Sequence, residues 1–271
     1  MDTSLPPAPA LTHANGNGLA HANGNGVNGA RAHAMNGVAN GLGARRTLRL
    51  HGRPATWTRG PARLTISRPE SAYLRFGKRA LDVVGATLAL VIGAPVLILA
   101  AVAIKLESRG PVLYRSTRIG RGGRPFTFIK LRSMVHDADS KRQDLSHLNQ
   151  ADGPVFKIFA DPRVTRVGRW LRRSSIDEMP QLFHVLSGEM SLVGPRPPLS
   201  EEVRQYEPWQ LHRLDVRPGL TCLWQISGRS RIGFDEWMRL DLEYIRNQSL
   251  LLDLKILLRT IPAVLSREGA Y

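Results

Sequence analysis

The fold of this chain is decided by a run of 22 uncharged residues, VVGATLALVIGAPVLILAAVAI, from Val83 to Ile104. The run is long enough for about one crossing of a bilayer. Gly93, Ala94 and Pro95 lie at its middle, where a proline removes a helix hydrogen bond and bends the helix. The run therefore predicts a membrane segment that is interrupted at its centre.

Both flanks of the run are basic, with Lys78 and Arg79 before it and Lys105 and Arg109 after it. A helix that crosses a membrane usually carries its basic residues on one side only. A re-entrant hairpin, with two arms of about 11 residues or roughly 16 Å each, explains both the flanks and the proline. A kinked span and a buried helix of a soluble protein are the alternatives. Asp82, at the mouth of the run, is expected to pair with Lys78 or Arg79.

The segment before the run lacks the residues of a hydrophobic core. Residues 1–45 consist mainly of Asn, Gly and Ala, and the hexapeptide HANGNG occurs twice. Such a segment cannot offset the entropy of ordering, so we expect a disordered tail. Residues 45–70 add seven arginines against one acid, Glu70, which favours an anionic membrane surface or, equally, a solvated linker. We therefore divide the chain into a tail (1–70), a membrane hairpin (71–109) and a cytoplasmic catalytic domain (110–271).

The net charge predicts polyanionic partners but does not distinguish one class of polyanion from another. The chain has 38 basic and 22 acidic residues, a net charge of +16. This charge favours nucleic acid, anionic lipid or phosphorylated substrates. No nucleic-acid-binding motif is present in the sequence. One cysteine, Cys222, excludes an intrachain disulfide, and the first residues do not have the pattern of a secretory signal.

After the run, the pattern predicts a small β-hairpin and then mostly helices, an α+β fold. Two β-like stretches, at residues 110–114 and 121–129, are separated by turn residues. Asp161-Pro162 predicts a helix start, and Ser249 to Leu265 predicts an apolar helix with a basic face. The latter suits either a membrane interface or a protein core.

The segment from Arg172 to Leu182, RRSSIDEMPQL, carries the chemistry. Pro180 belongs in the first turn of a helix, which places Asp177 and Glu178 at its N-terminus. An aspartate there stays ionised and can attack phosphorus, and a neighbouring carboxylate can hold Mg²⁺. The alternative is a capping box, in which Ser175 and Glu178 serve only structure.

Basic residues also recur in three proline- or glycine-containing turns. Arg196, Arg217 and Arg229 lie in GPRPP, VRPG and SGR, respectively. A stiff turn that fixes a guanidinium suits a bidentate phosphate contact, although a solvated surface arginine is the commoner case. Three such turns between residues 194 and 229 favour a phosphate site.

Together these motifs make residues 75–271 similar to the monotopic phosphoglycosyl transferases, the bacterial sugar transferases that start glycan assembly on undecaprenyl phosphate. No such resemblance covers residues 1–70. The matching motifs, in chain order, are Lys78-Arg79-Ala-Leu-Asp82, Phe128-Ile-Lys130-Leu-Arg132-Ser-Met134, Asp161-Pro-Arg-Val-Thr-Arg-Val-Gly168, Asp177-Glu178-Met-Pro-Gln181, Met190-Ser-Leu-Val-Gly-Pro-Arg-Pro197, Arg217-Pro-Gly219, Gln225-Ile-Ser-Gly-Arg229 and Leu240-Asp-Leu-Glu-Tyr244.

The resemblance implies a two-step reaction at the cytoplasmic face of the bacterial inner membrane. Asp177 attacks the β-phosphate of a UDP-sugar and expels UMP, and polyprenyl phosphate then takes the phosphosugar from Asp177. Glu178, with Asp177, would bind Mg²⁺. By matching position, the substrate-binding residues would be Lys130, Arg172, Arg196, Arg217, Arg229 and Asp241.

Two departures from the family pattern bear on these expectations. The hairpin turn reads Ala94-Pro95 where many relatives have Ser-Pro, and Gly219 is followed by LTCLWQ where many have ITGWAQ. The second is consistent with a subfamily that uses hexoses for exopolysaccharide. A membrane-tethered basic adaptor or polyanion-binding protein without catalysis is the alternative function, and assembly into a homo-oligomer is left open.

Overall fold

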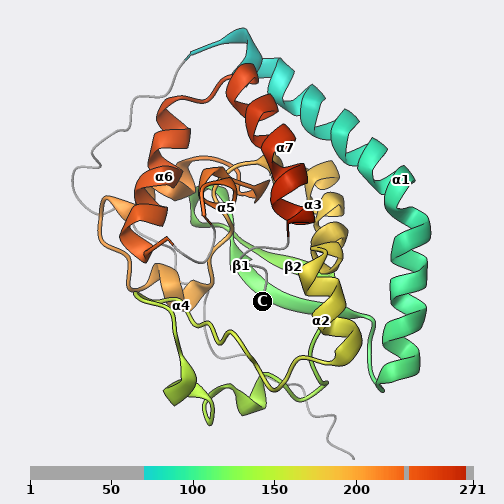
Figure 1. The fold of residues 1–271 in the computed structure, drawn as a ribbon. Helices are drawn as coiled ribbons and strands as arrows, with labels where there is room; N and C mark the ends of the chain where they lie inside the picture. Colours follow the sequence, from blue (N-terminus) through green and yellow to red (C-terminus); the bar gives the residue numbers. More distant parts are fainter. Residues whose placement is uncertain (1–69, 229–231, 267–271) are drawn as a thin grey trace, which may run out of the picture. The chain divides into compact units, whose positions relative to one another are not determined.

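The computed structural model describes residues 70–228 and 232–266, all within one compact unit of the chain. Helices dominate this part, and its strands form two small sheets (Figure 1), in agreement with a mostly helical α+β fold. The expected tail, nearly all of the basic segment that follows it, and Arg229 lie outside the described residues. The predictions made for them stay predictions.

The uncharged run forms one helix, α1 (Lys78–Glu107), after a π-helical turn, η1 (Tyr73–Gly77). Pro95 lies inside α1, and Figure 1 shows that the helix bends about midway. The structure therefore has one bent helix where the sequence predicted two arms of a hairpin. The bend is the expected effect of the missing proline N–H.

Packing explains why the two halves of α1 remain one helix. Ala86, Gly93 and Ala100 recur at seven-residue spacing on the inner face and are all buried, as is Ile104. A side chain on Gly93 would collide with Met179, whose methyl group lies 2.0 Å from the ideal Cβ position. Small residues let the whole helix lie close against the rest of this unit, and both halves are held there.

The outer face of α1 is apolar and exposed. Only 17% of its most apolar stretch of 18 residues is buried. A core helix of a soluble protein would be mostly buried, so this alternative does not fit. The exposed large apolar side chains of α1 are Val83, Val84, Leu88, Val91, Ile92, Val96, Ile98, Leu99, Val102 and Leu106.

Polar contacts at the start of α1 differ from the expected ones. Asp82 accepts hydrogen bonds from the Ser191 hydroxyl (2.9 Å) and the Leu192 N–H (2.8 Å), and it does not pair with a neighbouring cation of its own helix. Lys78 instead binds the buried Asp253 carboxylate at 2.7 Å. The reason is orientation, since Asp82 lies on the inner face, against strand β3 (Ser191–Val193).

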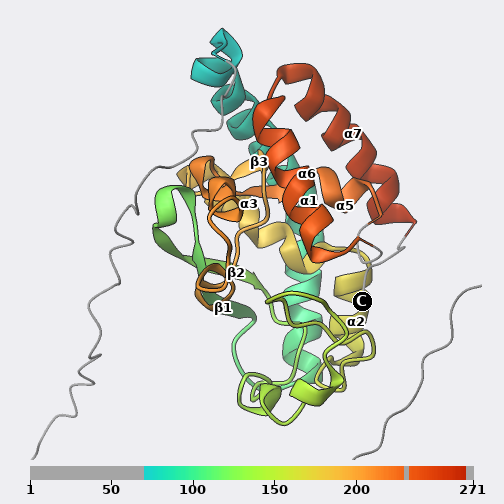
Figure 2. The same ribbon diagram turned by 90° about the vertical axis from the view of Figure 1, so that its left-hand side faces the viewer.

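The predicted β-hairpin is present. Strand β1 (Leu113–Ile119) pairs antiparallel with β2 (Pro125–Leu131) through the turn η2 (Arg121–Gly123). Strand β3 pairs in parallel with β4 (Gly219–Thr221). A long connection then joins β2 to α2 (Arg166–Arg173); Figure 2 shows it in yellow-green, and it contains only the short turns η3 (Ser140–Arg142) and η4 (Ser146–Leu148).

The helix predicted to begin at Asp161 begins instead at Arg166. Thr165 caps it, because its hydroxyl accepts the Gly168 N–H at 2.9 Å, whereas Asp161 is engaged with Arg163. The predicted C-terminal helix is confirmed, and the Ser249 hydroxyl caps its start. The remaining helices are η5 (Ile176–Gln181), α3 (Leu182–Ser187), α4 (Ser200–Val203), η6 (Gln210–Asp215), α5 (Leu223–Ile226), α6 (Phe234–Arg246) and α7 (Leu250–Leu265).

Candidate active site

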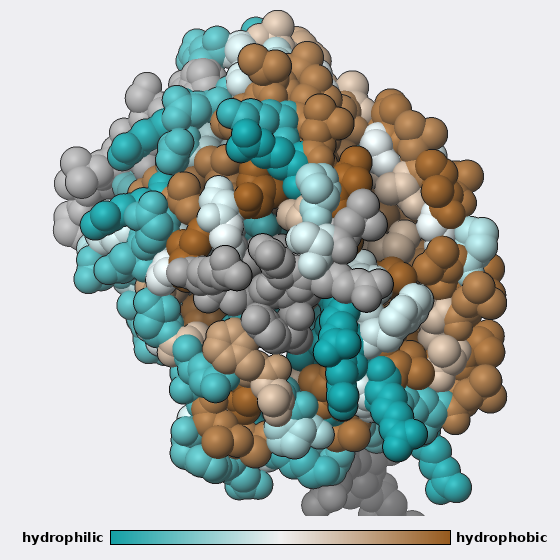
Figure 3. All heavy atoms as spheres, viewed as in Figure 1, coloured by the Kyte–Doolittle hydropathy of each residue, from teal (hydrophilic) through white to brown (hydrophobic). Residues whose placement is uncertain are grey.

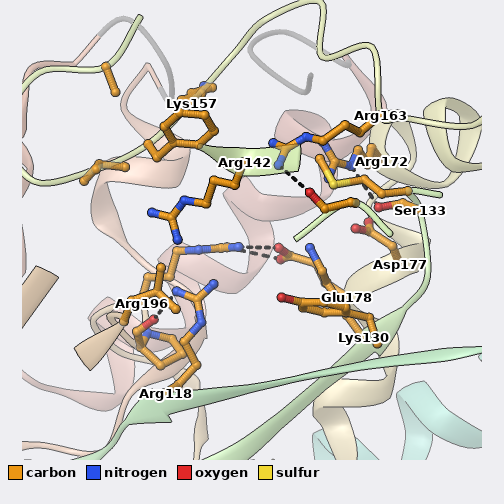
Figure 4. A pocket seen from close by; sticks show the side chains of 18 of the residues that line it. Arg118, Lys130, Ser133, Arg142, Lys157, Arg163, Arg172, Asp177, Glu178 and Arg196 are labelled. Carbon is orange, nitrogen blue, oxygen red and sulfur yellow. Dashed lines mark hydrogen bonds and ion pairs between the residues drawn. The ribbon is translucent and has the colours of Figure 1, made fainter. Parts of the chain in front are cut away.

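A cavity of about 770 Å³ opens between the hairpin, the long connection and the turn η5. Its volume is in the range of small-molecule sites. Nine arginines and lysines line it against five aspartates and glutamates, so its lining charge is positive. Figure 4 shows cations from different parts of the chain, among them Lys130, Arg172 and Arg196, on the same cavity as Asp177 and Glu178.

The two carboxylates lie at a helix start, as predicted, but Pro180 does not lie in the first turn as expected: η5 begins at Ile176, and Pro180 is its fifth residue. Asp177 and Glu178 lie in the first turn of η5. Ser175, just before, has φ of 55° and is the only non-glycine residue with positive φ in the described part of the chain. Ser175 makes no side-chain cap, so the capping-box alternative is contradicted. A left-handed serine there is strained, as backbone at functional sites often is.

Glu178 is held by Arg196. The Arg196 guanidinium donates to both carboxylate oxygens, at 2.6 and 3.4 Å. Burial alone would raise the pKa of Glu178, but the charge and hydrogen bond of Arg196 outweigh it and lower the pKa below the usual value. Glu178 is therefore ionised near neutral pH and faces a cavity rich in cations.

Asp177 is more deeply placed, with 5% of its surface exposed. Burial, and then the neighbouring Glu178 charge, raise its pKa to about 6, while Lys130 and Arg172 act against this rise. Asp177 therefore ionises just below neutral pH and keeps the basicity of a good nucleophile. Figure 4 shows Lys130 and Arg172 near the Asp177 and Glu178 side chains.

Lys130 comes from β2, and its position depends on two neighbours. Its ammonium lies 5.3 Å from the centre of the Tyr114 ring, and burial lowers its pKa to about 8. The adjacent Ile129 N–H donates to His184 Nε2 at 3.1 Å, and His184 Nδ1 bonds Glu189 at 2.7 Å. His184, in α3, thereby ties the outer edge of β2 to the helix that follows η5.

Arg172 is fixed from α2. Its Nε donates to the Ser133 hydroxyl at 2.9 Å. Gly168 allows this approach, since a Cβ there would lie 1.9 Å from the Ser133 carbonyl oxygen. The motif that ends at Gly168 therefore brings α2 close enough for Arg172 to reach the cavity.

The structure places five of the six predicted substrate-binding residues, three of them in the cavity and two outside it. Lys130, Arg172 and Arg196 line it together with Asp177 and Glu178. Arg217 lines a second cavity, with Arg121 and Arg124. Asp241 is buried and binds Arg213 at 2.7 Å. A direct contact of Arg217 or Asp241 with substrate has no support in this geometry, and Arg229 lies outside the described residues.

The sequence did not single out several other cations of the cavity. Arg163 is fixed by two hydrogen bonds from its guanidinium to Asp161, and Arg142 and Arg163 both lie over the Phe156 ring, at 5.2 and 5.6 Å. Arg118 donates to the Pro197 carbonyl oxygen at 3.2 Å. The sequence signal that could have found Arg118 was the alternation of side chains along a strand, because Arg118 lies on β1, which borders the cavity.

The donor set suits a weakly held Mg²⁺ and no tighter site. Within residues 70–228 and 232–266, no group of three or more His, Cys, Asp or Glu side chains could hold a metal ion. Asp177 and Glu178 supply two adjacent carboxylates. Mg²⁺ commonly binds one or two carboxylates together with substrate phosphates and water. The two residues therefore fit an ion that arrives with a phosphorylated ligand.

Comparisons with known proteins identify the family of the chain. Residues 73–267 match the family model described as bacterial sugar transferase. The chain is 48% identical over 202 residues to "UDP-glucose:undecaprenyl-phosphate glucose-1-phosphate transferase" of Caulobacter vibrioides (strain ATCC 19089 / CIP 103742 / CB 15), a match that covers 72% of each chain. It is 39% identical over 198 residues to "Exopolysaccharide production protein ExoY" of Rhizobium meliloti (strain 1021), covering 72% of this chain and 88% of the relative.

A third relative is longer. "Galactosyl transferase CpsE" of Streptococcus agalactiae serotype III (strain NEM316) is 46% identical over 194 residues, which cover 71% of this chain and 43% of the relative. The chain thus spans less than half the length of this relative.

Proposed function

The chain belongs to the bacterial sugar transferase family, and from this membership we propose that it transfers a sugar 1-phosphate from a UDP-sugar to a polyprenyl phosphate. The product would begin an exopolysaccharide or a related glycan, and the relatives' names favour glucose or galactose as the sugar. The observation that carries the proposal is the Asp177–Glu178 pair, in the first turn of η5 and surrounded by cations.

In the first step, a carboxylate oxygen of Asp177 forms a bond to the β-phosphorus of the donor. The bond from that phosphorus to the bridging oxygen breaks, and UMP leaves with the electron pair. Lys130, Arg172 and Arg196 line the same cavity as Asp177 and would stabilise the charge that develops on the donor phosphates. A lowered lysine pKa does not prevent this role, because a phosphate beside Lys130 favours its charged form.

In the second step, an oxygen of the lipid phosphate attacks the same phosphorus. The bond to Asp177 breaks, and the carboxylate is restored as polyprenyl diphosphate sugar forms. Asp177 and Glu178 would hold Mg²⁺ together with the donor, and the ion would supply neutralising charge for the pyrophosphate during the first step. Glu178, ionised and fixed by Arg196, is the residue best prepared to hold it.

The test is an intact-mass measurement after the protein is mixed with a panel of UDP-sugars and Mg²⁺, without lipid acceptor. The wild-type protein should gain the mass of one phosphosugar and release one UMP. Asp177→Asn keeps the size but removes the attacking charge, so it should do neither. An adduct that persists in Asp177→Asn would place the nucleophile elsewhere.

The same proposal includes the membrane. We infer that α1 inserts its apolar outer face into the inner membrane while both of its ends stay on the cytoplasmic side. Support comes from contacts at the two ends: Lys78 binds Asp253, and the carbonyl oxygens of Ser108 and Arg109 accept from Arg132. Both ends thus belong to one compact unit, and a straight crossing would have to place part of that unit on the far side.

Cysteine labelling tests this topology. Arg75→Cys and Arg109→Cys, each in a Cys222→Ser background, place one exposed thiol at either end of the helix. An impermeant maleimide should label both from the cytoplasmic side of inverted vesicles and neither from outside intact cells. Labelling from opposite sides would establish a true span and contradict the re-entrant arrangement.

A further inference from the structure

The outer face of α2 combines three arginines with one tryptophan. Arg166, Arg169, Trp170 and Arg173 follow the spacing of a single helix face, and all four are exposed. Trp170 has 53% of its surface exposed, a large fraction for so apolar a side chain. Among the described residues, none of the three arginines has an ion-pair partner. This face carries unneutralised positive charge.

The inner face of α2 fixes which way these residues point. Leu171 is fully buried against Ala100 and Ile104 of α1, with Val167 packed beside them. The Val167 N–H donates to the Glu107 carboxylate at 3.1 Å, which joins the start of α2 to the end of α1. The basic face is therefore turned outward, beside the second half of α1.

The neighbouring surface of α1 is apolar. Ile98, Leu99, Val102 and Leu106 each expose more than half of their area. Figure 3 shows hydrophilic side chains over α2 beside the brown edge formed by α1. Arginines and tryptophan that border an apolar strip are typical of a bilayer interface, where indole rings lie at headgroup level and arginines attract anionic lipid.

We propose that this face of α2 binds the headgroup phosphates of anionic phospholipids. The proposal rests on the membrane insertion of α1 inferred above. A guanidinium can contact a phosphodiester through two hydrogen bonds, and three guanidiniums on adjacent turns suit neighbouring headgroups. Trp170 between them would insert its ring at the level of the ester groups.

Because α2 also carries Arg172, headgroup binding to its outer face would affect the cavity. Arg172, on the same helix, reaches inward to Ser133, and the chain passes from α2 to Asp177 within four residues of Arg173. Headgroups that hold the outer face of α2 would also hold the orientation of this helix. The lipid surface thereby sets the position of the arginine beside the nucleophile.

Photocrosslinking tests the contact without requiring turnover. Full-length Asp177→Asn protein would be placed in nanodiscs of phosphatidylcholine with 30% phosphatidylglycerol, in which one lipid or the other carries a photoreactive headgroup. Peptide mapping then measures labelling of residues 165–174. Each arginine near an anionic surface strengthens the attraction about fivefold. The phosphatidylglycerol probe should therefore label this segment at least fivefold more than the phosphatidylcholine probe.

Two triple variants make the comparison specific. Arg166→Gln, Arg169→Gln and Arg173→Gln together should reduce labelling by the anionic probe to the level of the neutral one. The matched control changes Arg204, Arg239 and Arg246 to Gln; these are also exposed but lie on or near α4 and α6, away from α1 in Figure 1. The control should leave the labelling unchanged, and near-ultraviolet circular dichroism would verify that both variants are folded.

Several outcomes would overturn the proposal. Equal labelling by the two probes would mean that this face of α2 lies near the bilayer but does not prefer anionic headgroups. Unchanged labelling in the α2 variant would remove the arginines from the contact. Displacement of the probe by polyprenyl phosphate at one equivalent would assign the face to the lipid acceptor, and displacement by RNA would assign it to nucleic acid. Failure of the protein to float with vesicles would instead contradict the membrane insertion on which the proposal rests.

Discussion

Two arginine–carboxylate pairs lie next to each other in this protein and differ mainly in their access to solvent. In the cavity, Arg196 binds Glu178 at 2.6 Å, and their side chains are 30% and 20% exposed. Behind them, Arg213 binds Asp241 at 2.7 Å, and each side chain is 1% exposed. Arg213 also donates to the Arg196 carbonyl oxygen at 2.9 Å, so the second pair supports the loop of the first.

The comparison shows that the same kind of ion pair can serve ligand binding when it is exposed and structural support when it is buried. A carboxylate at the cavity wall can exchange its arginine for a ligand or a metal ion. A fully buried carboxylate has no such exchange available, and its charge is tolerated only while its partner remains. The family motifs place Asp241 among residues around the active site, whereas this geometry makes it a support for Arg196.

The largest expected effect is on the buried pair. Asp241→Ala leaves the Arg213 charge buried and unpaired, which should lower the free energy of unfolding by about 3–5 kcal/mol. Urea denaturation in detergent micelles would measure it. The double variant Asp241→Leu with Arg213→Met should recover much of the loss, because it leaves no lone charge. If Asp241→Ala instead has normal stability and a raised KM for the donor, Asp241 contacts the substrate.

Glu178→Gln should give the opposite pattern. The Gln side chain keeps the size but loses the charge that Arg196 and a metal ion need, so turnover should fall about 10²–10³-fold. Stability should change by less than about 1 kcal/mol, since partly exposed pairs contribute little. UMP release and urea denaturation on the same preparation separate the two effects. A variant that loses stability and keeps its turnover would make Glu178 structural.

The smallest effect concerns pH. Asp177 attacks only when ionised, and burial raises its pKa to about 6, so adduct formation should fall about tenfold per pH unit below that value. Lys130→Gln removes a positive charge that lowers this pKa. The acid limb of the pH–rate profile should therefore move to higher pH.

Lys157→Gln is the matched control for this shift. Lys157 also lines the cavity, but it is not among the main charges that act on the Asp177 pKa. Single-turnover rates of adduct formation, measured with donor and Mg²⁺ well below saturation so that they report the free site, would be compared across the three proteins. An acid limb that moves equally in both variants would mean that net cavity charge, and not Lys130, sets the ionisation of Asp177.

Local chemistry made much of this structure predictable from the sequence. The helix start predicted at Asp177 and Glu178 is present, although Pro180, expected in the first turn, is the fifth residue of η5. Turn residues between β-like stretches predicted the hairpin that presents Lys130. The motif turn at Arg196 predicted a fixed guanidinium, and its partner proved to be Glu178.

The remaining errors arose from tertiary partners that no local pattern reveals. Asp161 is a reasonable helix cap, but Arg163 engages its carboxylate, and the helix begins at Arg166. Asp82 has cations one turn away and binds strand β3 instead. Arg213 lies in no motif, and it binds Asp241 and the Arg196 carbonyl oxygen. Local sequence did not predict these contacts, because both partners are distant in sequence.

The half-buried position of Lys130 also makes this residue a target for chemical modification. With a pKa of about 8, close to half of its amine is uncharged at pH 8. An ordinary lysine with a pKa of about 10.4 is only about 0.4% uncharged at that pH. Acylating reagents that fit the cavity should therefore modify Lys130 before the other lysines. An electrophile built onto a nucleotide-like core could inactivate the enzyme covalently through this amine while the aspartate stays untouched.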